Sequence, residues 1–128
     1  MHGLHLTADL RDCAPDQPAL ADALALRALC RGAVAAVGLT PVGEVFHAFP
    51  GGGATGVVLL AESHVAVHTW PELRAVTLDV YVCNLGADNA DRARRLLAAL
   101  EQAFGAARAE RHALLRGAAF APTPVPQP

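Results

Sequence analysis

Residues 75–83, with the sequence AVTLDVYVC, alternate between apolar and polar side chains from end to end. The apolar side chains all fall on one face: Val76, Leu78, Val80 and Val82. The other face carries Thr77, Asp79, Tyr81 and Cys83. A period of two residues is typical of a β-strand that buries one side. The second side is too polar for a core, so it must meet solvent, a partner or a functional site.

The same pattern predicts further strands on both sides of this one. Residues 2–10 alternate cleanly, and their apolar face carries Leu4, Leu6, Ala8 and Leu10. Residues 42–49, 56–61 and 64–70 are short apolar segments bounded by turn formers such as Pro50 and Pro71, which predicts three more strands. Residues 107–115 carry a weaker strand pattern.

Two segments have the spacing of amphipathic helices instead. The first spans about 18–37, before Gly38, and its apolar stripe is Leu26, Leu29, Cys30, Ala33 and Val37. The second spans 89–104, with Asn89 as a candidate cap and Gly105 as the stop. Its stripe is Ala93, Leu96, Leu97, Leu100 and Phe104.

The order of strand, helix, several strands, helix and strand predicts an α+β fold. We expect a two-layer sandwich, with a mostly antiparallel sheet and both helices on one face. Residues 1–120 form a single domain in this prediction. Residues 121–128 contain four prolines and no core residue, so a disordered tail is expected there.

The composition excludes several classes of function. The chain has 128 residues and a net charge of −2, without a basic run, so nucleic acid is not an expected partner. Its apolar stretches are too short to span a membrane, and its first residues do not resemble a signal peptide. Three cysteines without a C-x-x-C pair indicate a reducing cytoplasm, with neither a disulfide scaffold nor a metal site. A content of 53% hydrophobic residues is rich for a small monomer and fits an extra apolar face buried in an oligomer.

Chemistry concentrates in residues 61–72, AESHVAVHTWPE. Three interpretations compete. Ser63, His64 and His68 could be ordinary turn and strand residues. Ser63 and His68 could belong to a hydrolase, but the G-x-S-x-G elbow is missing. A metal site on His64 and His68 fails because, in a strand, these residues lie roughly 13 Å apart.

The same residues resemble the self-processing signature of the prokaryotic S-adenosylmethionine decarboxylases. The signature is E-S-H-x-x-x-H-T-W-P-E, here at 62–72. Four further segments resemble the family in order: HLTAD (5–9), FHAF (46–49), TGVV (55–58) and DVYVC (79–83). Thr55 stands where the family usually has serine. Five ordered motifs covering roughly residues 4–115 make a chance match implausible.

The resemblance implies a proenzyme that cuts itself between Glu62 and Ser63. Ser63 would attack the Glu62 carbonyl, and the residue matching His68 would remove the Ser63 α-hydrogen. The chain from residue 63 onward would then begin with a pyruvoyl group, which forms a Schiff base with the substrate amine and draws electrons away as pyridoxal phosphate does. Cys83 matches the family's proton donor, and its place on the polar strand face agrees with that role.

The resemblance also implies S-adenosylmethionine as substrate, decarboxylated for spermidine synthesis, and a homodimer of cleaved protomers. Phe49, Trp70 and Glu72 could contact the adenosyl group. The polar sheet face, with His5, Asp9, Asp79 and Tyr81, is expected near the active site and a subunit contact.

Two departures from the family pattern concern the substrate. The family usually has an aromatic-glycine pair where this chain has Leu73-Arg74, and glycine where it has Asn84. Arg74 would disfavour a cationic substrate if it faced the pocket. Since some relatives decarboxylate ornithine or arginine, a pyruvoyl-dependent ornithine or arginine decarboxylase is the alternative. A non-catalytic regulatory homologue is a third possibility, but it would have no need of Ser63, His68 and Cys83.

Overall fold

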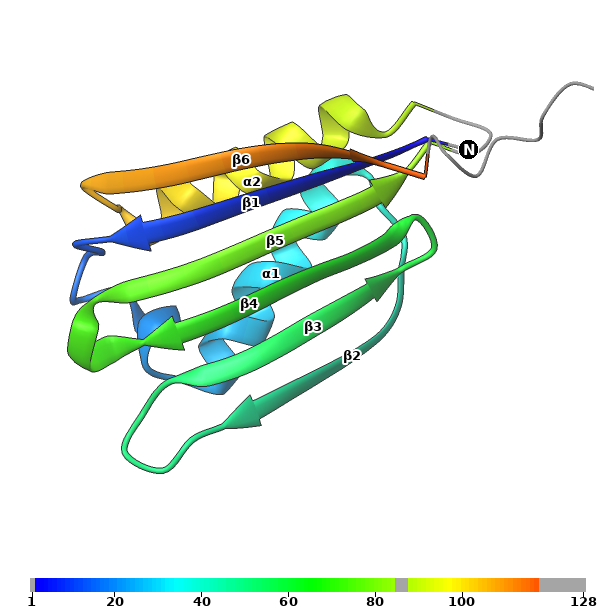
Figure 1. Ribbon diagram of the computed structural model, residues 1–128. Helices are drawn as coiled ribbons and strands as arrows, with labels where there is room; N and C mark the ends of the chain where they lie inside the picture. Colours follow the sequence, from blue (N-terminus) through cyan, green and yellow to red (C-terminus); the bar gives the residue numbers. More distant parts are fainter. Residues whose placement is uncertain (1, 85–87, 118–128) are drawn as a thin grey trace, which may run out of the picture.

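A computed structural model describes residues 2–84 and 88–117 (Figure 1). Within them the chain forms β1 (Gly3–Arg11), α1 (Ala23–Val37), β2 (Pro41–Ala48), β3 (Ala54–Leu60), β4 (Ser63–Trp70), β5 (Ala75–Cys83), α2 (Ala90–Phe104) and β6 (Arg108–Arg116). The strands make one sheet in the order β2-β3-β4-β5-β1-β6, and every neighbouring pair is antiparallel. Both helices cover the same face of this sheet. The predicted two-layer α+β sandwich is therefore confirmed.

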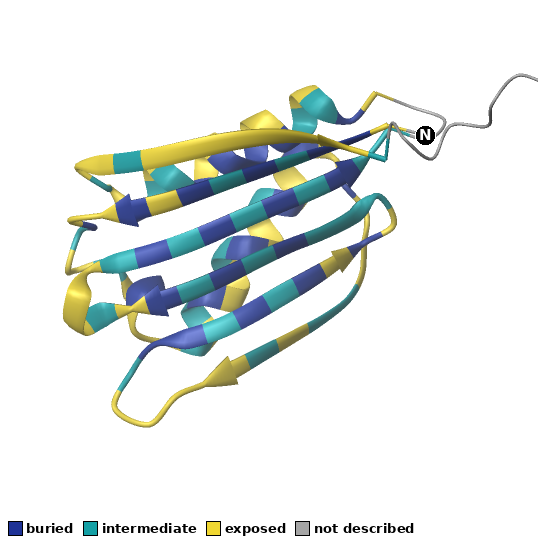
Figure 2. Ribbon diagram, in the orientation of Figure 1, coloured by how far each residue is buried: buried dark blue, intermediate teal, exposed yellow. Residues whose placement is uncertain are grey.

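The core lies between the sheet and the helices. On β5 the aliphatic side chains that set the strand pattern are buried, whereas the polar ones between them are half-buried on the other face. β1 follows the same alternation. All five residues of the predicted α2 stripe are buried, and Phe104 is fully enclosed. Figure 2 shows the resulting alternation of buried and partly exposed residues along the central strands.

The first helix begins later than expected. Pro18–Leu20 forms a short 3-10 turn, and α1 starts only at Ala23, because the Asp22 side chain accepts a hydrogen bond from the Leu24 N–H and caps the helix. Its fully buried stripe is Leu26, Cys30, Val34 and Val37; Leu29 and Ala33 are only partly buried.

The second helix is also capped differently from the expectation. Asn89 occupies the cap position, but its side chain makes no capping hydrogen bond to the helix. It donates instead to the Cys83 carbonyl, with 3.0 Å between the two atoms. The side chain of Asp88 accepts from the Ala90 N–H in its place.

The face of the sheet opposite the helices is left open, and the side chains on it decide what the molecule can bind. β4 and β5 contribute their half-buried polar residues to this open face. Within the described residues, no helix is both long and apolar enough to cross a membrane. The predicted tail at 121–128 lies outside the described residues.

Candidate active site

The tight turn between β3 and β4 contains Glu62 and Ser63. Ser63 has a φ of 152°, a backbone conformation that side-chain-bearing residues rarely adopt. Such a conformation costs of the order of 1–3 kcal/mol and persists only where the surroundings enforce it. Thr40 provides this restraint: its N–H donates to the Glu62 carboxylate, and its carbonyl accepts from the Ala61 N–H. The peptide between Glu62 and Ser63 is therefore held in strained geometry.

The carbonyl of Glu62 has a donor already in place. The backbone N–H of Cys83, at the end of β5, donates to it across 2.7 Å. This contact follows from the strand register, in which Ser63 lies opposite Val82. A backbone N–H aimed at a carbonyl oxygen stabilises negative charge that develops there when the carbon is attacked.

Cys83 differs from the other two cysteines in its surroundings. Cys13 and Cys30 are buried, whereas Cys83 is partly exposed. Burial raises the pKa of the Cys30 thiol to about 12 and also raises the pKa of the Cys13 thiol. Cys83 sits on the open face, as its strand parity predicts, and its carbonyl is held by Asn89. It is the thiol that a small molecule on this face could reach.

A second group of the predicted residues surrounds a cleft at the other end of β4. The cleft has a volume of about 420 Å³, and His68 lines it together with Phe49, Trp70 and Glu72. The His68 ring stacks on the Trp70 indole, with 6.1 Å between ring centroids. Phe49 and Trp70 are among the exposed large apolar side chains. The three residues named for substrate contact thus share one hollow with His68.

Thr55 holds His68 in this position. Its Oγ1 lies 3.0 Å from His68 Nδ1, because β3 pairs with β4 and sets the two residues opposite each other. The sequence recorded only that Thr55 replaces a serine; the strand register shows what the hydroxyl does. Such a partner fixes the imidazole's orientation and the location of its proton.

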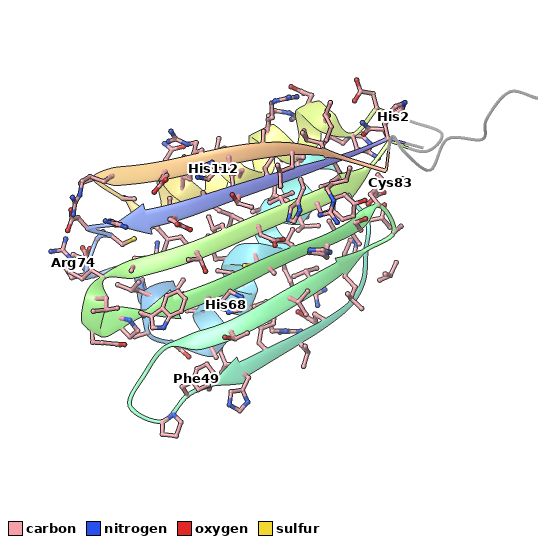
Figure 3. All side chains as sticks on the ribbon, viewed as in Figure 1. His2, Phe49, His68, Arg74, Cys83 and His112 are labelled. Atoms are coloured by element: carbon pink, nitrogen blue, oxygen red, sulfur yellow. The ribbon has the colours of Figure 1, made fainter. Side chains whose placement is uncertain are left out.

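The chain brings Ser63 and Cys83 together but not His68. Five residues of extended strand separate Ser63 from His68, which corresponds to about 16 Å. Figure 3 shows Cys83 and His68 well apart along the sheet, with Phe49 on the His68 side. Within one protomer, His68 cannot reach the α-hydrogen of Ser63.

The two departures from the family pattern lie away from the cleft. Arg74 ends a 3-10 turn in the left-handed conformation, with φ 48°, which explains why glycine suits this position. Its Nε donates to the Cys13 carbonyl at 2.8 Å, and Arg74 does not line the cleft with His68. Arg74 is therefore not placed to repel a cationic substrate from this cleft. Asn84 accepts from the Asn89 N–H and supports the end of β5.

Comparison with known proteins identifies the relatives of this arrangement. Residues 4–117 match the model of the family described as S-adenosylmethionine decarboxylase. The S-adenosylmethionine decarboxylase proenzyme of Aquifex aeolicus is 46% identical over 81 residues, which cover 63% of this chain and 58% of that protein. The proenzyme of Symbiobacterium thermophilum is 40% identical over 99 residues, which cover 77% of this chain and 74% of that protein.

A solved structure extends the similarity to the fold. The crystal structure of the adenosylmethionine decarboxylase from Aquifex aeolicus matches with a TM-score of 0.79 and 35% identity, covering 88% of each chain. By sequence, the chain spans less than three fifths of the length of the Aquifex aeolicus proenzyme, 58%.

Proposed function

The chain belongs to the S-adenosylmethionine decarboxylase family, and from this membership we propose that it is a self-cleaving proenzyme whose mature form decarboxylates S-adenosylmethionine. The observation that carries the proposal is the Glu62-Ser63 peptide, which is strained at Ser63 and polarised by the Cys83 N–H. The hydrogen bond belongs to the strand ladder, but an ordinary turn would not need the strained backbone at Ser63.

The cleavage chemistry follows from these groups. The Ser63 hydroxyl adds to the Glu62 carbonyl carbon, the C–N bond breaks, and an ester replaces the amide. Attack places negative charge on the carbonyl oxygen, where the Cys83 N–H already donates. Removal of the Ser63 α-proton then expels the Glu62 carboxylate from Cβ and leaves dehydroalanine. Water converts this residue to a pyruvoyl group and releases ammonia.

The pyruvoyl group fits position 63 because the peptide to be cut is the strained one, and the thiol side chain and carbonyl-binding N–H of Cys83 lie beside it. Once formed, the group supplies an electron sink for loss of carbon dioxide. The Cys83 thiol then has the task of returning a proton to the substrate carbon. In the cleft, the flat rings of Phe49 and Trp70 suit adenine, and the Glu72 carboxylate suits ribose hydroxyls.

We further propose a homodimer in which two open faces meet. The distance between Ser63 and His68 requires a histidine from elsewhere to take the α-proton. In this dimer the two sheets stack face to face, and the two-fold axis lies between them, perpendicular to the strands. The strands of the second subunit then run in the opposite direction to those of the first. The Ser63 end of β4 and the Cys83 thiol of one subunit then lie opposite the cleft of the partner subunit, which contains the partner's His68. Two equivalent composite sites result, and the half-polar open face supports such a contact.

The substrate and the location follow from separate observations. The relatives described above are named for S-adenosylmethionine, and none of them for ornithine or arginine, so the amino-acid alternative is not retained. Free thiols at Cys13, Cys30 and Cys83 suit a reducing compartment, and we propose the cytoplasm.

Two measurements on purified full-length chain test the function. Intact-mass analysis should find two chains, 1–62 and 63–128, with pyruvoyl at the start of the second, while Ser63→Ala remains a single chain. The cleaved protein should release carbon dioxide from carboxyl-labelled S-adenosylmethionine and not from ornithine or arginine. A wild-type chain that stays uncut after long incubation would refute self-cleavage, and release from ornithine or arginine alone would refute the substrate.

A further inference from the structure

Three polar side chains converge on the open face near the Ser63 end of β4. They come from the neighbouring strands β1, β5 and β4, which lie side by side in Figure 1. His5 Nε2 is 3.1 Å from Asp79 Oδ2, and His64 Nε2 is 3.0 Å from Asp79 Oδ1. All three ligand atoms lie within 4.8 Å of one another. Two imidazoles therefore share one carboxylate.

The spacing of these atoms is close to what a tetrahedral metal ion needs. With metal–ligand bonds of about 2.1 Å, ligand atoms of a tetrahedral site stand about 3.4 Å apart. The two imidazole–carboxylate separations are within a few tenths of an ångström of that value, although they run to different oxygens of Asp79. One ligand atom from each residue lies within 4.8 Å of the other two, so the side chains must close in by at most about 1.4 Å to reach this spacing. In a single subunit the side chains of His64 and Asp79 are 33% and 35% exposed, so a water, or a group of the partner subunit in the proposed homodimer, could complete the coordination.

One of the imidazole nitrogens lacks a good partner in the metal-free chain. His5 Nε2 is buried and makes no hydrogen bond, since the approach to Asp79 has the distance of a bond but not its direction. Buried nitrogens are nearly always satisfied, so an orphan beside a carboxylate and a second imidazole requires an explanation. A bound cation at Nε2 would satisfy it.

Arg116 is the group that opposes a cation here. Its Nη1 lies 3.0 Å from His5 Nδ1, and its guanidinium lies over the Tyr81 ring. Because arginine only donates, His5 Nδ1 accepts and the imidazole proton sits on Nε2. A metal at Nε2 requires that proton to move to Nδ1 and Arg116 to turn away. Arg116 is exposed on the edge strand β6, so it is free to do so.

We propose that His5, His64 and Asp79 form a binding site for a divalent transition-metal ion that prefers imidazole ligands, such as Zn²⁺, and that Arg116 weakens it. Two neutral imidazoles and a carboxylate with open positions suit this class of ion, whereas Mg²⁺ and Ca²⁺ prefer all-oxygen sites. Within one subunit the site stands apart from the His68 cleft, and its metal binding does not depend on the proposed decarboxylation. Its ligands join three strands beside the cleavage point, so an occupied site would clamp that end of the sheet.

Titration of the tag-free, full-length protein with Zn²⁺ alone, followed by calorimetry, tests the proposal. We expect one ion per chain, and visible absorption bands of tetrahedral cobalt when Co²⁺ is used instead. His5→Ala and Asp79→Asn should each weaken Zn²⁺ binding at least about tenfold. Replacing a residue that only hydrogen-bonds to a metal ligand already lowers affinity by about that factor, and replacing the ligand itself should lower it no less. Arg116→Gln should bind more tightly than wild type.

Two matched controls separate this site from adventitious binding. His112→Ala and His2→Ala remove exposed histidines outside the cluster and should leave the affinity unchanged. The proposal is overturned if neither wild type nor Arg116→Gln binds Zn²⁺, or if binding survives Asp79→Asn and is lost in a control. Because binding is measured without substrate, failure here leaves the proposed decarboxylation untouched, and the reverse also holds.

Discussion

The backbone N–H of Cys83 donates a hydrogen bond to the carbonyl oxygen of Glu62, with 2.7 Å between nitrogen and oxygen. One residue thus offers two groups to two different steps of the proposed chemistry. The N–H belongs to the strand ladder and cannot be removed by changing the side chain. The thiol points to the open face, and a substitution at Cys83 does remove it. Cleavage and turnover should therefore respond differently to substitutions at Cys83.

We expect Cys83→Ala to cleave itself, because the N–H that polarises Glu62 is retained, but to turn over poorly. General acid catalysis is worth roughly 10²–10⁴ in rate, so carbon dioxide release should fall at least about 100-fold. Without the thiol, the proton is delivered to the former keto carbon of the pyruvoyl group instead of the substrate α-carbon. Residue 63, the first residue of chain 63–128, then becomes alanine. Intact-mass analysis after turnover should detect this alanine. A rate and lifetime equal to wild type would exclude Cys83 as the proton donor.

A composite site across a dimer predicts rescue between two inactive chains. Ser63→Ala and His68→Ala should each remain uncut alone. When the two variants are co-expressed, mixed dimers contain one site with Ser63 from the His68→Ala chain and His68 from the partner subunit. We therefore expect cleavage of the His68→Ala chain only, up to the fraction of mixed dimers. Mass analysis distinguishes the two chains. If no cleavage occurs although mixed dimers form, the histidine does not act across the interface.

Arg74 should affect stability and not the substrate. Arg74→Ala keeps the left-handed backbone and loses the hydrogen bond to the Cys13 carbonyl, so the free energy of unfolding should fall by about 1 kcal/mol. Arg74→Gly loses the same bond but relieves a backbone penalty of about 1 kcal/mol, so it should stay near wild type. Denaturation is best measured in the uncut Ser63→Ala background. KM should not change in either variant; a large rise would place Arg74 at the substrate.

Cys30 makes the stability of the fold sensitive to alkaline pH. Burial raises its pKa from the usual 9.0 to about 12, so above pH 9 the unfolded chain loses this proton while the folded chain keeps it. The contribution is complete below pH about 9 and is lost as pH rises toward about 12, at up to about 1.4 kcal/mol per pH unit.

Urea unfolding of the Ser63→Ala chain at pH 8 and pH 10 should detect this loss. Cys30→Val in the same background should show a shallower decline. Some decline should remain, because burial also raises the pKa of Cys13. An unchanged slope in Cys30→Val would mean that its thiol is not shielded in the folded state.

Much of the fold could be predicted because its signals are local. Each strand and helix carries its own period, and the elements alternate in an order that allows few layer arrangements. The β5 pattern identified both the buried face and the face with Cys83, and the structure confirms the alternation. The predicted start of α1 is too early, because the Asp22 side chain caps the helix and residues 18–20 form a separate 3-10 turn. The motifs identify the site residues, but they do not show which of these residues lie close together.

Strand parity depends only on the position along the chain, so the sequence alone assigns each side chain to a face. It placed His64 and His68 on one side of β4 and correctly kept them too far apart for one ion. The neighbours of these side chains depend on how the strands pair in three dimensions. Strand order brings His5 and Asp79 to His64, Thr55 to His68, and the Cys83 N–H to Glu62. These contacts join residues 13 to 74 positions apart. Pairing and register across a sheet arise from packing the whole core, which no local pattern encodes.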